Sequence, residues 1–310
     1  VSNFQGNSIY RMPVTSAPGV TPPTYGPISS FAAIPTPAGL DADPSGYVYV
    51  ADRRTNGIHR INPLSQSRQI GFGISYPTAL WVDDSGKYVL TQLGNLLKID
   101  PSGNLSLYAY GLVSARGLVK DSAGMLYTVQ KDLDALTQVR PDGSSAVVLT
   151  GLEDADNATP MIRNGKLYLR SRLSFDSPGP VYANQGEVWE FNLASLGAPR
   201  RLRALHRGAT ALARDASGGA YDGWYYLLHG QESSVVRVKR LATGTRTEPV
   251  LTDTVRLKNP QDLWVDGNGQ IWIADYDGTS GNGGLYVYSP NGTLAKDYSA
   301  SVNKPTHLYH

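Results

Sequence analysis

Asp262 and His307 are the two side chains of this 310-residue sequence whose types best suit acid–base chemistry. A carboxylate beside an imidazole holds one tautomer of the ring, so that the other ring nitrogen can act as a base. We therefore expect His307 or His229 to be the base of any reaction, with Asp262 as its orienting residue. Arg116 could bind an anion or a developing oxyanion. The same side chains could equally line a hydrated channel and take part in no reaction.

An internal repeat sets the position of these residues. Each copy has a small or polar pair of residues and a leucine, an apolar stretch, a turn drawn from Asp, Ser and Gly, and a strand rich in Tyr or Trp. The copies are clear at residues 37–52, 77–92, 116–130 and 260–275, and weaker around Met161 and Leu212. A third strand follows each copy, so each unit is expected to be a small antiparallel meander. Such units at a spacing of about 40 to 45 residues are typical of propeller blades.

The number of repeats predicts the number of blades. Each copy contains one apolar anchor residue. The last anchor, Leu308, has no predicted strands after it, whereas the N-terminal segment resembles the later strands of a blade that lacks its first strand. We therefore predict one all-β domain over residues 1–310, a seven-bladed β-propeller of four-stranded antiparallel blades closed by strands from both termini. A six-bladed propeller with a loose terminal hairpin is the alternative. The apolar anchors of the copies are Leu40, Leu80, Leu118, Met161, Leu212, Leu263 and Leu308.

One mouth of the predicted channel is the expected binding site. In a propeller the innermost strand begins at the face where the second strand ends, so residues at these two points surround the mouth. A loop over residues 173–186, between a second and a third strand, is expected to overhang it. The candidate ligand-binding residues are Asn3, Asp52, Gln92, Arg116, Gln130, Arg172, Phe175, Tyr182, Gln261 and Asp275.

The sequence leaves open a divalent metal at this mouth. Ca²⁺ takes six to eight oxygen ligands. Asn3, Asp52, Asp262 and Asp275 supply few carboxylates, and no glutamate is among them. Ca²⁺ or Mg²⁺ could bind there, but the sequence assigns no set of metal ligands.

The composition excludes several kinds of site and partner. The chain has no cysteine, which excludes disulfides, thiolate metal sites and a cysteine nucleophile. Its 28 basic and 26 acidic residues give a net charge of +2 without a basic run, so we expect no nucleic-acid partner. No apolar run approaches the roughly 18 residues that a membrane helix needs, so we expect no membrane insertion.

The first residues suggest a compartment. The chain begins Val1-Ser2-Asn3 rather than with Met, which we interpret as a mature or trimmed product. We therefore expect an extracellular or periplasmic protein. We also expect the protein to be a monomer.

The repeated phrase resembles a known family. Residues 37–52 read almost as an NHL repeat, and residues 259–275 look the same. The resemblance implies a propeller fold, shared by protein- and RNA-binding NHL domains, by seven-bladed virginiamycin B lyases and by six-bladed SMP-30-like calcium hydrolases. The lyase group would imply a His base and a magnesium ion held with Glu, in a His-x-Glu pattern. His229-Gly230-Gln231 and His307-Leu308-Tyr309 depart from that pattern.

Three functions are compatible with these observations. The leading hypothesis is a non-catalytic recognition or scaffold propeller that binds a protein, a polysaccharide or another extended polymer at the channel mouth. The second is a hydrolase or lyase that acts on a small lactone or ester-like molecule through His307 or His229 and Asp262. The third is a structural repeat module within a longer chain.

Overall fold

The computed structural model describes residues 2–3, 7–16, 24–150, 152, 160–163, 165–171, 187–203, 209–241, 243–276, 283–302, 305 and 308. The chain folds into two compact units. Unit 1 contains Val1–Ala33 and Arg203–His310, and unit 2 contains Ile34–Ala183 and Glu187–Leu202. The prediction of a single domain remains a prediction. Within the described ranges, no helix is long and apolar enough to cross a membrane.

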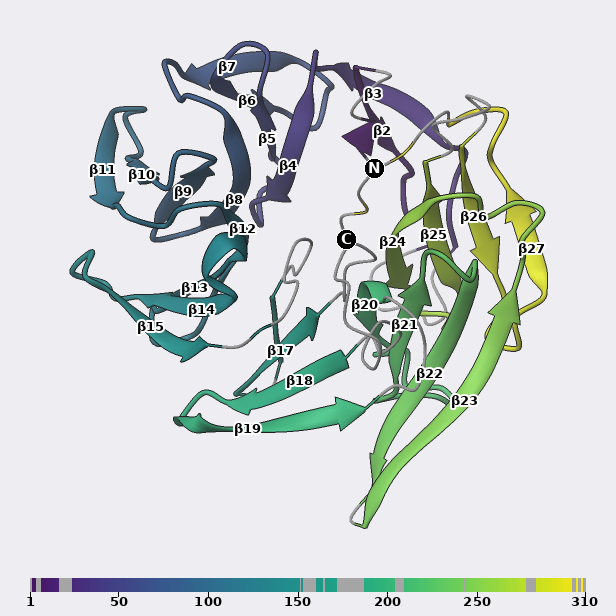
Figure 1. The fold of residues 1–310 in the computed structure, drawn as a ribbon. Coiled ribbons are helices and arrows are strands. Elements are labelled where there is room, and N and C mark those ends of the chain that lie inside the picture. Colours follow the sequence, from purple (N-terminus) through teal and green to yellow (C-terminus); the bar gives the residue numbers. More distant parts are fainter. Residues whose placement is uncertain are drawn as a thin grey trace. The chain divides into compact units, whose positions relative to one another are not determined.

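Unit 2 is built from four antiparallel sheets, each of four strands in chain order (Figure 1). In each sheet the first strand is paired only with the second and the fourth only with the third, which is the meander that the repeat predicts. A short 3-10 helix, η1 (Lys131–Leu133), follows β13. The strands are β4 (Pro37–Ala42), β5 (Val48–Asp52), β6 (Gly57–Ile61), β7 (Ser67–Gly71), β8 (Pro77–Asp83), β9 (Gly86–Thr91), β10 (Leu96–Ile99), β11 (Leu105–Ala109), β12 (Ala115–Lys120), β13 (Leu126–Gln130), β14 (Ala135–Val139), β15 (Ser145–Thr150), β16 (Met161–Arg163), β17 (Lys166–Ser171), β18 (Glu187–Asn192) and β19 (Ser195–Arg203).

Unit 1 contains two more four-stranded sheets and one sheet of three strands. The three-stranded sheet is formed entirely by the N-terminal segment. The strands are β20 (Ala209–Arg214), β21 (Tyr225–His229), β22 (Ser234–Leu241), β23 (Gly244–Thr252), β24 (Pro260–Val265), β25 (Ile271–Asp275), β26 (Gly284–Tyr288), β27 (Leu294–Asp297), β1 (Ser2–Asn3), β2 (Ser8–Arg11) and β3 (Ser29–Ala33).

The all-β propeller class is confirmed, but the prediction of seven four-stranded blades is wrong, because the described residues form six. The seventh blade required a strand from the C-terminus, and no strand follows β27 in the described part of the chain. The anchor Leu308 donates its backbone N–H to the Asp262 carboxylate instead of to a neighbouring strand. Pro305, three residues earlier, has no N–H to offer a ladder. The six-bladed alternative gives the correct number of blades.

An aspartate at the start of the first hairpin in five of the four-stranded sheets explains why these turns form. The Asp43 carboxylate accepts the backbone N–H groups of Ser45 and Tyr47 at 3.0 and 3.1 Å. Gly46 closes this turn with φ +80°, a conformation that costs glycine little. Asp266 accepts the N–H groups of two turn residues in the same way at the last four-stranded sheet.

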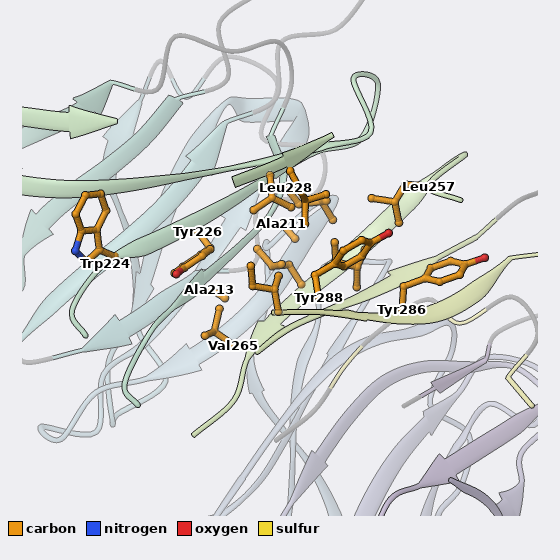
Figure 2. Close-up of a cluster of buried hydrophobic side chains, with 14 residues drawn as sticks. Ala211, Ala213, Trp224, Tyr226, Leu228, Leu257, Val265, Tyr286 and Tyr288 are labelled. Atoms are coloured by element: carbon orange, nitrogen blue, oxygen red, sulfur yellow. The ribbon is translucent and has the colours of Figure 1, made fainter. Parts of the chain in front are cut away.

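One hydrophobic core of unit 1 lies between its two four-stranded sheets (Figure 2). Large rings such as Tyr226 and Tyr288 are fully buried beside the small side chains of Ala211 and Ala213. The Tyr288 hydroxyl donates to Asp253 Oδ2 at 3.0 Å, so its polar end is not left unsatisfied in the core. This packing holds β20 against β24 and fixes the strand ends that carry the candidate residues of unit 1.

Small residues let the first strands of neighbouring sheets approach closely in unit 2. A Cβ atom at Gly39 in β4 would lie 3.0 Å from Ala79 Cα in β8. Two residues further along, the buried Asp41 accepts the N–H of Val82 at 2.6 Å and so ties the same two strands together. The small residue before the anchor Leu40 therefore serves the close packing of β4 against β8.

Candidate functional site

In four of the sheets the residue that ends the second strand is buried and polar. Strand register places Asp52 opposite Pro37, Gln130 opposite Ala115, His229 opposite Ala209 and Asp275 opposite Pro260. All four side chains are almost completely buried. The structure therefore places these four residues at the ends of second strands, as the sequence predicts, but their side chains are buried in the protein interior rather than exposed to solvent.

Gln92 does not occupy this position in the β8–β11 sheet. Register places Thr91 opposite Pro77, and Gln92 is exposed in the following turn. The reason is a shorter first hairpin: Leu80 pairs with Val89, nine residues on, whereas its counterpart Leu40 pairs with a residue ten positions on. If the distance from the anchor to the end of the second strand is taken from the β4–β5 hairpin, the predicted residue in the β8–β9 hairpin is therefore Gln92, one position beyond the correct Thr91.

Asp52 and Asp275 have the same structural role in different units. Asp52 Oδ1 accepts the backbone N–H of Thr36, and Asp275 Oδ1 accepts that of Asn259, in both cases 16 residues earlier in the chain. Asp52 also accepts the Arg54 N–H at 2.9 Å. Each carboxylate thus joins the end of a second strand to the segment that enters the first strand, which leaves it less able to bind a ligand.

His59 is a candidate residue that sequence reasoning did not select. Its Nε2 lies 3.4 Å from Asp52 Oδ2 and 3.2 Å from Thr55 Oγ1, and Ser67 Oγ is 3.5 Å from its Nδ1. Burial lowers the pKa of His59, against the opposing attraction of Asp52. Period-two alternation could have revealed the contact, because His59 pairs with Val50 and so shares a face with Asp52.

The Asp262 carboxylate is occupied by backbone amides. Oδ1 accepts the N–H of Leu263 and Oδ2 accepts the N–H of Leu308, both at 2.9 Å. The neighbouring Gln261 donates through Nε2 to the backbone and side-chain oxygens of Asn259. Two oxygens already engaged in this way are poorly placed to orient an imidazole.

Several predicted residues lie outside the described part of the chain. His307, Arg172, Phe175 and Tyr182 belong to this group, so the proposed His307–Asp262 pair stays a prediction. Asn3 is described through its backbone, which pairs with Ser8 in β1 and β2.

Two arginines of unit 2 lie close enough for their charges to interact. Arg53 directly follows β5, and its Nε donates to the Pro77 carbonyl, at the first residue of β8, at 3.4 Å. Arg116 is the second residue of the adjacent strand β12, and its Nη1 is buried without a hydrogen-bond partner in the described structure. Burial lowers the pKa of Arg53, and repulsion by the Arg116 charge lowers it further. Sequence analysis selected Arg116 but had no signal for Arg53.

Loops on the same side of unit 2 carry six exposed large apolar side chains. The loops before β8 and β12 and the turns after β9 and β13 all lie where first strands begin and second strands end. Backbone hydrogen bonds connect them, from Gln92 to Tyr76 and from Leu112 to Gly94, both at 2.9 Å. We call this set the apolar rim: Phe72 (68% exposed), Tyr76 (56%), Leu93 (64%), Tyr110 (74%), Val113 (52%) and Leu133 (54%).

Comparison with known proteins gives a result at the level of structure. No protein-family model matches the sequence. No curated protein matches it. A solved streptogramin B lyase has a TM-score of 0.66 at 11% identity, over 96% of this chain and 89% of the lyase. Virginiamycin B lyase from Staphylococcus aureus has a TM-score of 0.66 at 10% identity, over 86% and 85% of the two chains. Hydrazine synthase from Kuenenia stuttgartiensis has a TM-score of 0.62 at 12% identity, over 86% of each chain.

The chain has the fold of the SMP-30/NHL-like β-propellers. This confirms the resemblance inferred from the repeated phrase. Identities this low show the fold alone, and proteins with this NHL-like fold include enzymes of unrelated chemistry. The fold therefore does not determine the function of this chain, which depends on its own side chains.

The candidate carboxylates of this NHL-like propeller do not fit a divalent metal site. Asp52 Oδ1 and both oxygens of Asp262 accept backbone amides, and Asp52 Oδ2 accepts the Thr55 hydroxyl, whereas a cation needs those lone pairs. Among the residues that the structure describes, no group of three or more His, Cys, Asp or Glu side chains is arranged to hold a metal.

Proposed function

We propose that this chain is a non-catalytic recognition propeller that binds a protein partner through the apolar rim of unit 2. The rim itself supports the proposal. A folded protein seldom leaves several large apolar side chains exposed on connected loops, and such surfaces are typical of interaction sites. Phe72, Tyr76 and Tyr110 are the kind of residues that anchor protein interfaces.

The expected partner is an extended segment that carries apolar and acidic side chains. Exposed Arg54 follows β5, and Lys131 begins η1, so positive charge adjoins the rim. The nearby Asp132 is already engaged by the Ser114 hydroxyl. Complementary charge would orient an acidic segment and speed its association, while the rim residues supply the buried apolar area.

Peptide display against the purified chain tests this proposal. Peptides selected on the unmodified protein are expected to bind a Phe72→Ser/Tyr110→Ser variant at least 10-fold more weakly, because two apolar anchors are lost. Leu64→Ser is the matched control, since Leu64 is 79% exposed but lies on the β6–β7 turn. Equal binding to the rim variant and the control, or a failure of any displayed peptide to bind the unmodified protein, would contradict the proposal.

The enzymatic alternative has its own test. His229 is fully buried at the end of β21, and Asp262 is held by amides, so neither is well placed to meet a substrate. We expect no turnover of small lactones, of simple esters or of a streptogramin B. Turnover that is lost in a His229→Ala variant that still folds would support the hydrolase or lyase hypothesis instead.

A further inference from the structure

We propose that Arg53 and Arg116 form an oxyanion-binding site in unit 2, which takes a carboxylate or phosphate group of the bound partner. The inference rests on the proposed function only for the source of the anion. The site itself is argued from the two guanidinium groups and their surroundings.

Arg53 and Arg116 lie at strand ends in two different sheets. Arg53 contacts the carbonyl of Pro77, at the first residue of β8, and Arg116 is the second residue of the neighbouring strand β12. The two arginines are therefore carried by the two sheets whose first strands contact β8, Arg53 just after the end of a second strand and Arg116 at the start of a first strand. Arginine presents its N–H groups in a planar fork that matches the oxygens of a carboxylate or a phosphate.

The Arg116 Nη1 is buried and has no hydrogen-bond partner in the described structure. A buried N–H group without a partner costs free energy, more so when it is charged. An oxyanion at this place would accept that hydrogen bond.

The positive charges of Arg53 and Arg116 repel each other. The charge of Arg116 acts on Arg53 strongly enough to lower its pKa, in addition to the larger effect of burial. Like charges brought together by a fold cost stability, and an anion between them removes the repulsion. The buried carboxylate at the end of β5, Asp52, accepts the N–H groups of Thr36 and Arg54 through Oδ1 and the Thr55 hydroxyl through Oδ2.

The site adjoins the apolar rim. Arg53 begins the turn after β5, and the loop before β8 that bears Phe72 and Tyr76 bonds through Ile74 to Asn56 of the same turn. A partner lying on the rim could therefore place an acidic or phosphorylated residue at the two arginines.

Small anions test the site without any partner. The unmodified chain is titrated with inorganic phosphate, and separately with acetate, at constant ionic strength maintained with sodium chloride. Thermal melting and the ³¹P line width of phosphate report binding. We expect a saturable rise in Tm and a broadened ³¹P signal, because a ligand that binds only the folded state stabilises it.

Arg116→Gln and Arg53→Gln are the test variants, and Arg68→Gln, an exposed arginine of β7, is the matched control. We expect each test variant to weaken phosphate or acetate binding at least 10-fold, and Arg116→Gln to melt no lower than the unmodified chain in chloride alone. The control should bind as before. A stronger response to phosphate than to acetate would identify a phosphorylated partner, and the reverse a carboxylate.

Unchanged saturable binding in both test variants, or an equal loss in Arg68→Gln, would overturn the site. So would the absence of saturable binding in the unmodified chain. Should Arg116→Gln fail to fold, Arg53→Gln and the ³¹P signal still decide the matter. Anion binding with no effect of the rim variants on peptides would leave this site standing while the proposed function fails.

Discussion

Asp262 Oδ2 accepts the backbone N–H of Leu308 at 2.9 Å, across 46 residues of the chain. The same carboxylate accepts the N–H of Leu263 through its other oxygen. One side chain thus fastens the C-terminal segment to the first strand of the last four-stranded sheet. This contact takes the place of the strand pairing that a seventh blade would have required.

Asp262→Ala is expected to lower the free energy of unfolding by about 1–3 kcal/mol, because two backbone N–H groups lose a charged acceptor. Urea unfolding followed by tryptophan fluorescence measures the change. Asp84→Ala serves as the control, since Asp84 is exposed on the β8–β9 hairpin. The structural role of Asp262 would be refuted by equal stabilities of the two variants.

Gly39→Ala is expected to destabilise unit 2 by about 1–3 kcal/mol through overpacking. The added Cβ would lie 3.0 Å from Ala79 Cα and 3.3 Å from the Thr78 carbonyl, both backbone atoms that cannot move aside cheaply. Gly219→Ala is the control, because its Cβ would meet only the Ser217 hydroxyl. Denaturant midpoints that agree within error would show that β4 and β8 can separate at little cost.

Asp83 should contribute to stability in a pH-dependent way. Burial alone would raise the pKa of Asp83, but hydrogen bonds from Ser85, Lys120 and Trp81 outweigh it and lower the pKa to about 2 from an ordinary value of 3.8. A carboxylate with a depressed pKa stabilises the fold above its unfolded-state pKa, and this contribution is lost as the pH falls through the folded-state value.

The difference in unfolding free energy between the unmodified chain and Asp83→Asn is therefore expected to be constant above about pH 5 and to shrink from pH 4 towards pH 2. Unfolding curves at several pH values measure it. A difference that is independent of pH over this interval would mean that the hydrogen bonds from Ser85, Lys120 and Trp81 do not favour the charged carboxylate.

His59 is expected to titrate below the ordinary histidine value of 6.5, because burial of its ring outweighs the attraction of Asp52. The folded state then binds fewer protons than the unfolded state near that pH, so stability falls as the pH is lowered through 6.5. His59→Gln should lack this part of the pH dependence. NMR titration of the histidine ring protons checks the order of the two values, and a His59 midpoint at or above 6.5 would contradict it.

Much of the fold could be predicted from local patterns. The pattern of residues 37–52 predicts β4, the turn that begins with Asp43, and β5. This is possible because the alternation of apolar and polar residues and the residue preferences of turns depend on neighbours in the sequence. The same reasoning located Asp52, Gln130, His229 and Asp275 at the ends of second strands. It assigned Gln92 where Thr91 stands, since one hairpin is a residue shorter.

What remained was decided by contacts between distant parts of the chain. Leu308 follows the pattern of an anchor, yet its N–H is taken by Asp262, and the described strands form six four-stranded sheets. Arg53 and Arg116 carry no shared signal in the sequence and are brought together only when β8 and β12 pack side by side. Periodicity reports which face of a strand is buried, whereas the partners of a buried charge depend on which strands meet, and that is settled by packing over the whole unit.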